Sequence, residues 1–484
     1  MVNRIRYAVI GTGSRAGMYI DALTGAHSED GELAALIDLN TGRLQYYSDR
    51  IQQKRISNPN GLRQPSLWNP TDLEKAIEVE KIDRVIVTSP DFTHAAMVSR
   101  ALYAGADVVV EKPLTINAEG SRMIADAVRS SGHSVVMTFN YRYSPRNSAL
   151  RRVIQSGTIG QPLSIHFEWL LDTSHGADYF RRWHRDKRNS GGLLIHKASH
   201  HFDLVNWWID DVPKRVYASG GLRFYGAANG RRDGRDLTYT RGSLDTVRDP
   251  FALDLRADPQ LKALYFDNES LDGYWRDKSV FDPGITIEDT LSLVVDYTSG
   301  VSMSYSLTAH SPWEGYRVAI NGTRGRVEMD VVERGAVLLD ESDDHVVDPS
   351  ARRDPNGGVD LRPQGERICV QQHWGKPYEI PIEKRRGGHG GGDQILLHDV
   401  FVGTGDDPLS RRAHTIDGIK AVAVGIAGNR SLLRGEPINI VDLNLGIDCE
   451  ALGRESLRRK KLGFFGVNGG PGYGAPYSAP GAEL

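Results

Sequence analysis

The alternation of short apolar runs with helical patterns through residues 1–141 constrains the fold more than any other feature of the sequence. The apolar runs are 5-IRYAVIG-11, 32-ELAALID-38, 83-DRVIVTSP-90, 107-DVVVEKP-113 and 133-HSVVMTFNY-141. Apolar runs of this length, bounded by turn residues, are typical of strands buried on both faces. Helical patterns of roughly ten residues separate most of them, which predicts parallel pairing through βαβ units. We therefore expect residues 1–141 to form an α/β domain around a parallel sheet.

The pattern changes after residue 141, where longer stretches alternate apolar and polar residues. Alternation of this kind predicts antiparallel strands with one solvated face. Such stretches occur at 163–171, 289–300, 301–310, 315–323 and 324–331. The turn Thr298-Ser299-Gly300 suits a hairpin between the second and third of these strands.

These patterns divide the chain into two domains and a tail. The second domain is expected over residues 142–463, and an irregular tail rich in glycine and proline over 464–484. Two polar, glycine- and arginine-rich stretches inside the second domain, 226–250 and 342–392, predict long surface loops. The apolar helix expected at 415–435 is predicted to pack back on the first domain.

Composition excludes several classes of protein. The 484 residues are 39% hydrophobic and 25% charged, which allows a large core, and the formal net charge of -3 lacks the basic excess of a nucleic-acid binder. The two cysteines, Cys369 and Cys449, form neither a disulfide framework nor a clustered zinc site. The N-terminus lacks a secretory signal pattern, and no apolar run reaches the ~18 residues of a membrane span. We expect a cytoplasmic protein without nucleic-acid or membrane partners.

The turn 11-GTGSRAG-17 lies between the first strand and a predicted helix. Gly11 permits a tight turn and Gly13 allows close approach of a diphosphate, which the N–H groups at the start of the helix bind. Ser14 and Arg15 share this turn and are further candidate cofactor ligands. An ordinary strand–turn–helix is the alternative, but the sequence context favours a dinucleotide site.

Asp38 ends the second apolar run and favours NAD as the cofactor. A carboxylate at this position accepts hydrogen bonds from ribose hydroxyls and repels a 2′-phosphate, so NADP is the less favoured cofactor. Arg43 lies nearby and would soften this preference, whereas a helix cap is the structural alternative for Asp38.

Four motifs together resemble one enzyme family. They are 88-TSPDFTH-94, 111-EKP-113, 139-FNYR-142 and 191-GGLLIHKASHHFD-203. In this combination the chain resembles the glucose–fructose oxidoreductase, inositol dehydrogenase and MocA (Gfo/Idh/MocA) family. The resemblance implies a Rossmann domain followed by an α/β domain with an open, mostly antiparallel sheet. It further implies a sugar or cyclitol substrate at the domain junction and a homo-oligomer, dimeric or tetrameric. The candidate cofactor ligands that it implies are Ser89, Pro90, His94, Glu111 and Lys112.

Lys112 is also the first candidate for catalysis. The resemblance implies that the lysine of the EKP motif binds both cofactor and substrate. An ammonium group there would bind the reacting hydroxyl and ease its deprotonation before the hydride leaves. The structural alternative is a salt bridge at the domain junction. A cis bond is one way in which Pro113 would hold this strand end rigid.

The histidine cluster that follows the two glycines supplies further candidates. The family's helix reads G-G-x-x-x-D-x-x-x-H-x-x-D, so His200 and Asp203 match, while His196 replaces the first aspartate. On one continuous helix, spacing of four places His196 and His200 on the same face. We predict His200 as the general base, His196 as a hydroxyl ligand or proton relay, and Lys197 as a substrate ligand.

Each residue of this cluster has an alternative role. A buried structural histidine is the alternative for either imidazole, and a surface salt bridge is the alternative for Lys197. His-x-x-x-His is also a metal-ligand spacing, but zinc would need a third ligand such as His389, and we expect no metal.

The run 387-GGHGGGD-393 resembles one in the NAD-dependent glycosidases of glycoside hydrolase family 109. It makes His389 a candidate substrate ligand, with a flexible linker as the alternative. Aromatic rings stack on pyranose faces and guanidinium groups bind hydroxyls or anions. The other candidate substrate ligands are Asn140, Tyr141, Arg142, Trp183, His184 and Trp313.

Three functions fit these motifs. The first is an NAD-dependent oxidoreductase that transfers a hydride between a sugar or glycoside carbon and nicotinamide. The second is a glycosidase that acts by transient oxidation, elimination, hydration and re-reduction. The third is a non-catalytic NAD-binding sensor, against which the proton-transfer residues argue.

Overall fold

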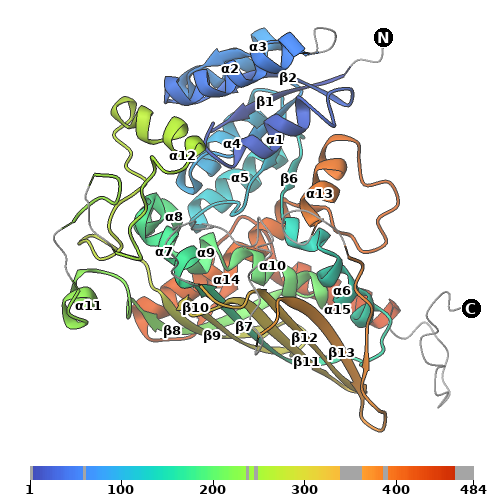
Figure 1. Cartoon of the computed structure of the whole chain (residues 1–484). Helices are drawn as coiled ribbons and strands as arrows, with labels where there is room; N and C mark the ends of the chain where they lie inside the picture. The colour runs from blue at the N-terminus through green and yellow to red at the C-terminus, as the bar shows by residue number, and fades with distance from the viewer. Residues whose placement is uncertain are drawn as a thin grey trace, which may run out of the picture.

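The computed structural model describes residues 4–57, 62–235, 239–244, 249–337, 362–384 and 391–463, which form two α/β domains (Figure 1). The sheet of the first domain has, within these residues, the strand order β15-β6-β5-β4-β1-β2-β3. Its strands are β1 (Ile5–Ile10), β2 (Gly31–Ile37), β3 (Ser66–Trp68), β4 (Arg84–Val87), β5 (Asp107–Val110), β6 (Val135–Met137) and β15 (Ala413–His414). All the pairings are parallel except that of β15 with β6, which confirms the predicted parallel sheet.

The order of these strands defines where a ligand can bind. The chain runs from β1 outward to β2 and β3, then returns to place β4 on the other side of β1. Ligands of open α/β sheets bind at the carboxyl ends of the strands, at such a switch point. The helices of this domain are α1 (Ala16–Leu23), α2 (Thr41–Ser57), α3 (Leu73–Glu80), α4 (His94–Tyr103) and α5 (Ala118–Ser131).

The second domain contains a larger sheet with the order β14-β13-β12-β11-β7-β10-β9-β8-β16 in the described residues. Its pairings are antiparallel except for β10 with β7, as predicted for a mostly antiparallel sheet. The expected hairpin at Thr298–Gly300 joins β9 to β10. The strands are β7 (Pro162–Asp172), β8 (Pro213–Gly221), β9 (Thr290–Tyr297), β10 (Ser302–Ser311), β11 (Glu314–Gly322), β12 (Gly325–Arg334), β13 (Gly365–Gln372), β14 (Tyr378–Glu379) and β16 (Ile438–Asn439).

Helices between the two sheets connect the domains (Figure 1). Helix α14 contacts β8 and α10 in the second domain and α5 and β6 in the first. Gly418 of α14 lies so close to Leu114 and Met137 that a Cβ atom would approach both to 3.1 Å. The helices of this part are α6 (Pro145–Gln155), α7 (Thr173–Arg181), α8 (Lys187–Ser190), α9 (Leu193–His196), α10 (Ser199–Trp208), α13 (Gly392–Phe401), α14 (Thr415–Arg434) and α15 (Cys449–Gly463).

The two expected loops contain regular structure. Strand β13 lies inside the stretch 342–392 and pairs with β12, so the loop prediction is wrong for those residues. Within 226–250, residues Ala227–Arg232 form helix α11. A further short helix, α12 (Pro259–Leu264), follows the stretch 226–250. The tail at 464–484 lies outside the described residues. None of the helices in the described part of the chain is long and apolar enough to cross a membrane.

Candidate active site

The glycine turn lies at the carboxyl end of β1, beside the loop that follows β4. Gly11 has a φ of +91°, and a Cβ atom there would lie 2.4 Å from the backbone of Ser89. Only glycine fits both the backbone conformation and this close approach. The two loops that were predicted to bind the cofactor are thereby held in contact.

Asp38 is bound by the backbone of the loops around it. Its carboxylate accepts hydrogen bonds from the Thr12 N–H at 2.6 Å, the Thr12 hydroxyl at 2.9 Å and the Asn40 N–H at 2.8 Å. Arg43 Nη2 lies 3.5 Å from the same carboxylate and also forms an ion pair with Asp272. Asp38 therefore sets the shape of the turn as well as its charge.

The motif residues beside the turn are bound mainly to each other. Arg15 Nε and the Tyr19 hydroxyl donate to Glu111 Oε1 at 2.6 and 2.7 Å. The arginine and the hydrogen bonds outweigh burial and keep the pKa of Glu111 below its usual value. His94 has its ring nitrogens 2.7 Å from the Pro113 carbonyl and 2.8 Å from the Ser89 carbonyl, so it ties together the loops after β4 and β5. Pro90 begins the turn that leads into α4.

Lys112 precedes a cis peptide bond to Pro113 and reaches the second domain. Its ammonium group lies 3.0 Å from His196 Nε2 and 3.1 Å from the His196 carbonyl oxygen. On the other side of the same ring, Nδ1 lies 2.5 Å from Asp91 Oδ2. An ammonium group only donates, so Nε2 accepts and Nδ1–H donates to Asp91. The three side chains form one continuous hydrogen-bonded chain, Lys112–His196–Asp91.

Burial sets the protonation of this chain. It lowers the pKa of Lys112 to about 8, against the opposing negative charges of Asp91 and Glu111. Burial, followed by the positive charge of Lys112, holds the pKa of His196 well below its usual value. Burial also raises the pKa of Asp91, which the charges of Lys112 and Arg182 oppose. A lysine with a pKa near 8 exchanges protons close to neutral pH, which is unusual for this residue type.

The helix that carries the histidines is broken, contrary to the single helix expected. Helix α9 ends at His196 and α10 begins at Ser199. At the break the Ala198 N–H donates to the Leu193 carbonyl at 2.8 Å, five residues back rather than four. This wider turn changes the register between His196 and the residues after it. His196 and His200 therefore reach different neighbours.

His200 faces an aromatic group next to the Lys112 chain. Its ring packs edge-on against Tyr141 and Phe139, with centroids 4.7 and 5.8 Å apart. The Lys197 ammonium lies 5.0 Å from the Trp169 ring centroid and 5.9 Å from that of Tyr141. Because Phe139 and Tyr141 follow β6, these groups meet at the same edge of the first sheet as Lys112.

Other predicted residues are held within the protein. Arg142 forms a buried two-point ion pair with Asp203 at 2.6 and 2.7 Å and a further ion pair with Asp417 of α14 at 3.3 Å. The guanidinium group thus fastens the chain after β6 to α10 and α14. Asn140 Nδ2 donates to Asp393 Oδ1 at 2.7 Å. His201 stacks on Trp169 beneath the site.

Trp183 and His184 lie beside His196. Their rings stack with centroids 3.6 Å apart, and the His184 ring is 4.1 Å from that of His196. Burial and the nearby positive charges keep the pKa of His184 well below its usual value. Trp313 is buried directly before β11, and His389 lies outside the described residues.

Asp91 is a candidate site residue that the sequence analysis missed. It stands inside the motif 88-TSPDFTH-94, directly after a strand of the parallel sheet. An acidic residue in such a loop is a usable signal, but only the fold brings it to His196, which lies 105 positions later. In the described residues, no group of three or more His, Cys, Asp and Glu side chains is placed to hold a metal ion.

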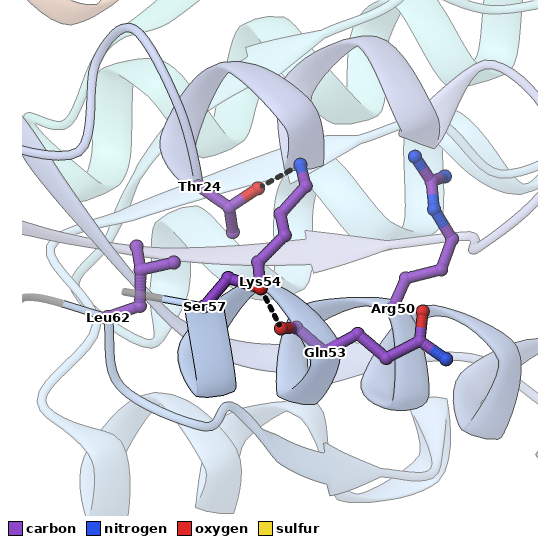
Figure 2. A pocket seen from close by; sticks show the side chains of 6 residues that line it. All are labelled: Thr24, Arg50, Gln53, Lys54, Ser57 and Leu62. Carbon is purple, nitrogen blue, oxygen red and sulfur yellow. Dashed lines mark hydrogen bonds between the residues drawn. The ribbon is translucent and has the colours of Figure 1, made fainter. Parts of the chain in front are cut away.

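A separate surface pocket of about 450 Å³ lies on the first domain (Figure 2). It is lined by Thr24, Arg50, Gln53, Lys54, Ser57 and Leu62. Thr24 follows the last residue of α1, the next four lie in the second half of α2, and Leu62 follows that helix, so the pocket lies away from the glycine turn that precedes α1. Both of its basic side chains form ion pairs with Asp21. The pocket is therefore distinct from the site around Lys112.

Comparisons with known proteins agree with this architecture. Residues 5–139 match the model of the oxidoreductase family's NAD-binding Rossmann fold, and residues 151–440 match that of its C-terminal alpha/beta domain. The chain is 32% identical over 452 residues to the oxidoreductase YteT of Bacillus subtilis, covering 90% of this chain and 97% of that protein.

Further similarity extends to proteins that are named as dehydrogenases. Inositol 2-dehydrogenase of Rubrobacter xylanophilus is 27% identical over 223 residues, which is 45% of this chain and 56% of that protein. A structure of levoglucosan dehydrogenase in complex with NADH and L-sorbose superposes with a TM-score of 0.60. It covers 91% of this chain and 99% of its own at 16% identity, so this likeness concerns the fold.

Proposed function

The chain belongs to the Gfo/Idh/MocA oxidoreductase family, and from that premise we propose that it is an NAD-dependent dehydrogenase of a sugar or glycoside. It would transfer a hydride between a hydroxyl-bearing carbon of the substrate and nicotinamide. The names of its relatives support a polyhydroxylated substrate, since they include inositol and levoglucosan dehydrogenases. The observation that carries the proposal is the hydrogen-bonded chain Lys112–His196–Asp91 at the domain junction.

The residues around the glycine turn fit a dinucleotide. The N–H groups at the start of α1 suit a diphosphate, and Asp38 suits the hydroxyls of the adenosine ribose. Ser89, Pro90 and Glu111 line the loops that meet there, and Lys112 extends from them toward the second domain. When bound, the nicotinamide ring supplies the hydride acceptor. A group of the protein is then needed to accept the proton of the reacting hydroxyl.

We assign the first proton transfer to Lys112. Its amine form binds the reacting hydroxyl and accepts the hydroxyl proton, because its pKa of about 8 leaves a useful fraction unprotonated near neutral pH. His196 orients the amine through Nε2, and Asp91 fixes the His196 tautomer through Nδ1. Removal of the proton makes departure of the hydride easier. This assignment gives Lys112 the role that the sequence pattern assigned to His200.

His200 remains the second candidate base. It lies against Tyr141 at the same edge of the first sheet, where it would bind a second hydroxyl of the substrate. Lys197, whose ammonium lies over Trp169, is a further candidate substrate ligand. The stacked pair Trp183 and His184 offers an aromatic surface of the kind that packs on the C–H face of a sugar ring.

The choice of NAD over NADP is supported by three charged side chains. Asp38 presents a carboxylate where a 2′-phosphate would lie. Arg43, which would otherwise attract that phosphate, is paired with both Asp38 and Asp272. Asp272 belongs to the second domain, so the proposed preference depends on both domains.

One assay tests the function. The purified protein is incubated with NAD+ and a set of cyclitols, free sugars and aryl glycosides in heavy water. A dehydrogenase forms NADH and ketone in equal amounts. A redox glycosidase instead releases the aglycone without net NADH and incorporates deuterium next to the transiently oxidised carbon. Dinucleotide binding with neither reaction over the whole set would contradict both and leave the sensor function.

A further inference from the structure

A segment of the second domain packs on the cofactor-binding edge of the first. Between β8 and β9 the chain forms α12 and a short 3-10 helix, Phe266–Leu271, both of which contact α2. Asn40 Nδ2 donates to the Asn268 carbonyl at 2.9 Å, and Arg43 pairs with Asp272. Figure 1 shows α12 beside the first domain, far from the sheet of its own domain. This segment is therefore anchored next to the glycine turn.

Tyr265 of this segment binds the glycine turn directly. Its hydroxyl oxygen accepts a hydrogen bond from the Ser14 N–H at 2.9 Å and lies 3.0 Å from the Ser14 hydroxyl. A Cβ atom on Gly13 would come within 3.1 Å of the same oxygen. The Ser14 N–H lies in the turn directly before α1, where the helix dipole favours an anion. The Tyr265 oxygen thus occupies a position suited to a phosphate oxygen.

In the part of the chain that the structure describes, Arg276 and Arg182 beside Tyr265 share the single carboxylate of Asp178 with Arg181. The Arg276 guanidinium carbon lies 4.9 Å from the Tyr265 ring centroid, and the residue is only 4% exposed. Among the described residues, its Nε and Nη1 atoms have no hydrogen-bond acceptor. Its ion-pair partner is Asp178 at 3.6 Å, which also binds Arg182 at 2.8 Å and lies 3.9 Å from Arg181.

Without a further anion, burying these guanidinium groups is unfavourable in free energy. A buried guanidinium group with unused donors loses its hydration and gains little in return. A single carboxylate cannot neutralise three guanidinium groups. The positive charges of Arg276 and Arg182 outweigh burial and lower the pKa of Tyr265, so their field extends to the hydroxyl on the turn.

We propose that Arg276, with Arg182, forms a second wall of the dinucleotide site and binds the diphosphate from the side opposite the glycine turn. The proposal rests on the proposed function and adds a contribution from the second domain. The two negative charges of a diphosphate match the two guanidinium groups in excess over Asp178. A phosphate oxygen replaces the Tyr265 hydroxyl at the Ser14 N–H, and Tyr265 moves aside.

Binding measurements test this proposal without relying on turnover. The affinities of NAD+ and ADP-ribose are measured by calorimetry for the full chain and for Arg276→Met, which keeps an apolar stem over Tyr265. Loss of a charge-assisted, two-point contact is expected to weaken both ligands about ten- to hundredfold. Arg276→Lys keeps the positive charge but not the two-point geometry of the guanidinium group, so it should lower the affinity for both ligands by an intermediate amount. Tyr265→Phe should leave NAD+ affinity unchanged or increase it, since it removes a competing oxygen.

The control is Arg256→Met, because Arg256 belongs to the same segment but is exposed and forms an ion pair with Asp254. It should bind NAD+ like the unaltered chain, and thermal unfolding of each variant checks folding. Affinity within twofold of the unaltered chain in both Arg276 variants would overturn the inference while leaving the dehydrogenase proposal intact. Unaltered protein that binds NAD+ but oxidises no substrate would overturn only the dehydrogenase proposal. An unaltered chain without NAD+ affinity overturns both.

Discussion

The candidate site has a cofactor side around Asp38 and Glu111 on the first domain and a reacting side around His196 on the second. These two sides differ in where their polar groups find hydrogen-bond partners. On the first domain, Asp38 is bound by Thr12 and Asn40, and Glu111 by Arg15 and Tyr19, all within one domain. On the second domain, His196 finds its partners Lys112 and Asp91 only across the junction. The carboxylates on the cofactor side are thus held mainly by their own domain, although Asp272 of the second domain pairs with Arg43 beside Asp38. The chain Lys112–His196–Asp91 on the reacting side forms only when both domains are docked. The following predictions test this difference, from the largest expected effect to the smallest.

Replacing Lys112 with methionine removes the hydrogen bond between Lys112 of the first domain and His196 of the second. We expect the rate of substrate oxidation to fall by about 10²- to 10⁴-fold, the range typical of a lost general acid–base group. Steady-state kinetics at pH 8 measures the effect. Lys75→Met, a change on the exposed face of α3, serves as the control and should leave the rate unaltered. Retention of more than a tenth of the activity in Lys112→Met would exclude Lys112 as the base.

Asp38→Ala tests the cofactor side alone. The loss of a carboxylate that binds ribose hydroxyls is expected to weaken NAD+ about tenfold or more, with a smaller loss for NADP+. Titration of both dinucleotides by protein fluorescence measures the two affinities. Equal losses for the two cofactors would mean that Asp38 only shapes the turn through Thr12 and Asn40.

Asp91→Asn tests the reacting side of the site through the pH dependence of the oxidation rate. The amine of Lys112 must be unprotonated to accept a proton, so the oxidation rate should rise with pH through about 8. The negative charge of Asp91 raises the pKa of Lys112, so its removal should move the rising limb to lower pH by roughly one unit.

The pH dependence of kcat in the two proteins measures this shift. His200→Gln serves as the comparison, since it should lower the rate without moving the limb. If His200→Gln removes the limb and Asp91→Asn leaves it in place, His200 is the base instead.

Asp272→Asn alters a contact that joins the two domains and should have the smallest effect. Without this partner, Arg43 keeps the longer ion pair with Asp38 and becomes available to a 2′-phosphate. We expect NADP+ affinity to increase about threefold to tenfold, with little change for NAD+. The ratio of the two dissociation constants is the measurement, and Asp267→Asn, elsewhere in the same segment, is the control. An unchanged ratio would remove Asp272 from cofactor selection.

Much of the fold follows from local sequence patterns. The continuous apolar runs predicted the parallel strands, and alternation predicted the hairpin of β9 and β10. Strand β13 was missed because 365-GERICVQQ-372 has only three apolar residues between polar ends and lies at the side of the sheet. The break between α9 and α10 was missed because Lys197 and Ala198 carry no helix-breaking signal. The wider turn there depends on how His196 and Lys197 are buried.

The sequence by itself determined the two-domain α/β architecture, the glycine turn and the residue types available for proton transfer. These depend on interactions between residues near one another in the chain, so periodicity and short motifs reveal them. Only the tertiary structure decided that Asp91 supports His196, that Arg142 is held by Asp203 and Asp417, and that Tyr265 meets Ser14. Each of these contacts joins residues at least 61 positions apart. Charge pairing across such distances is set by how the domains pack, and no local pattern records it.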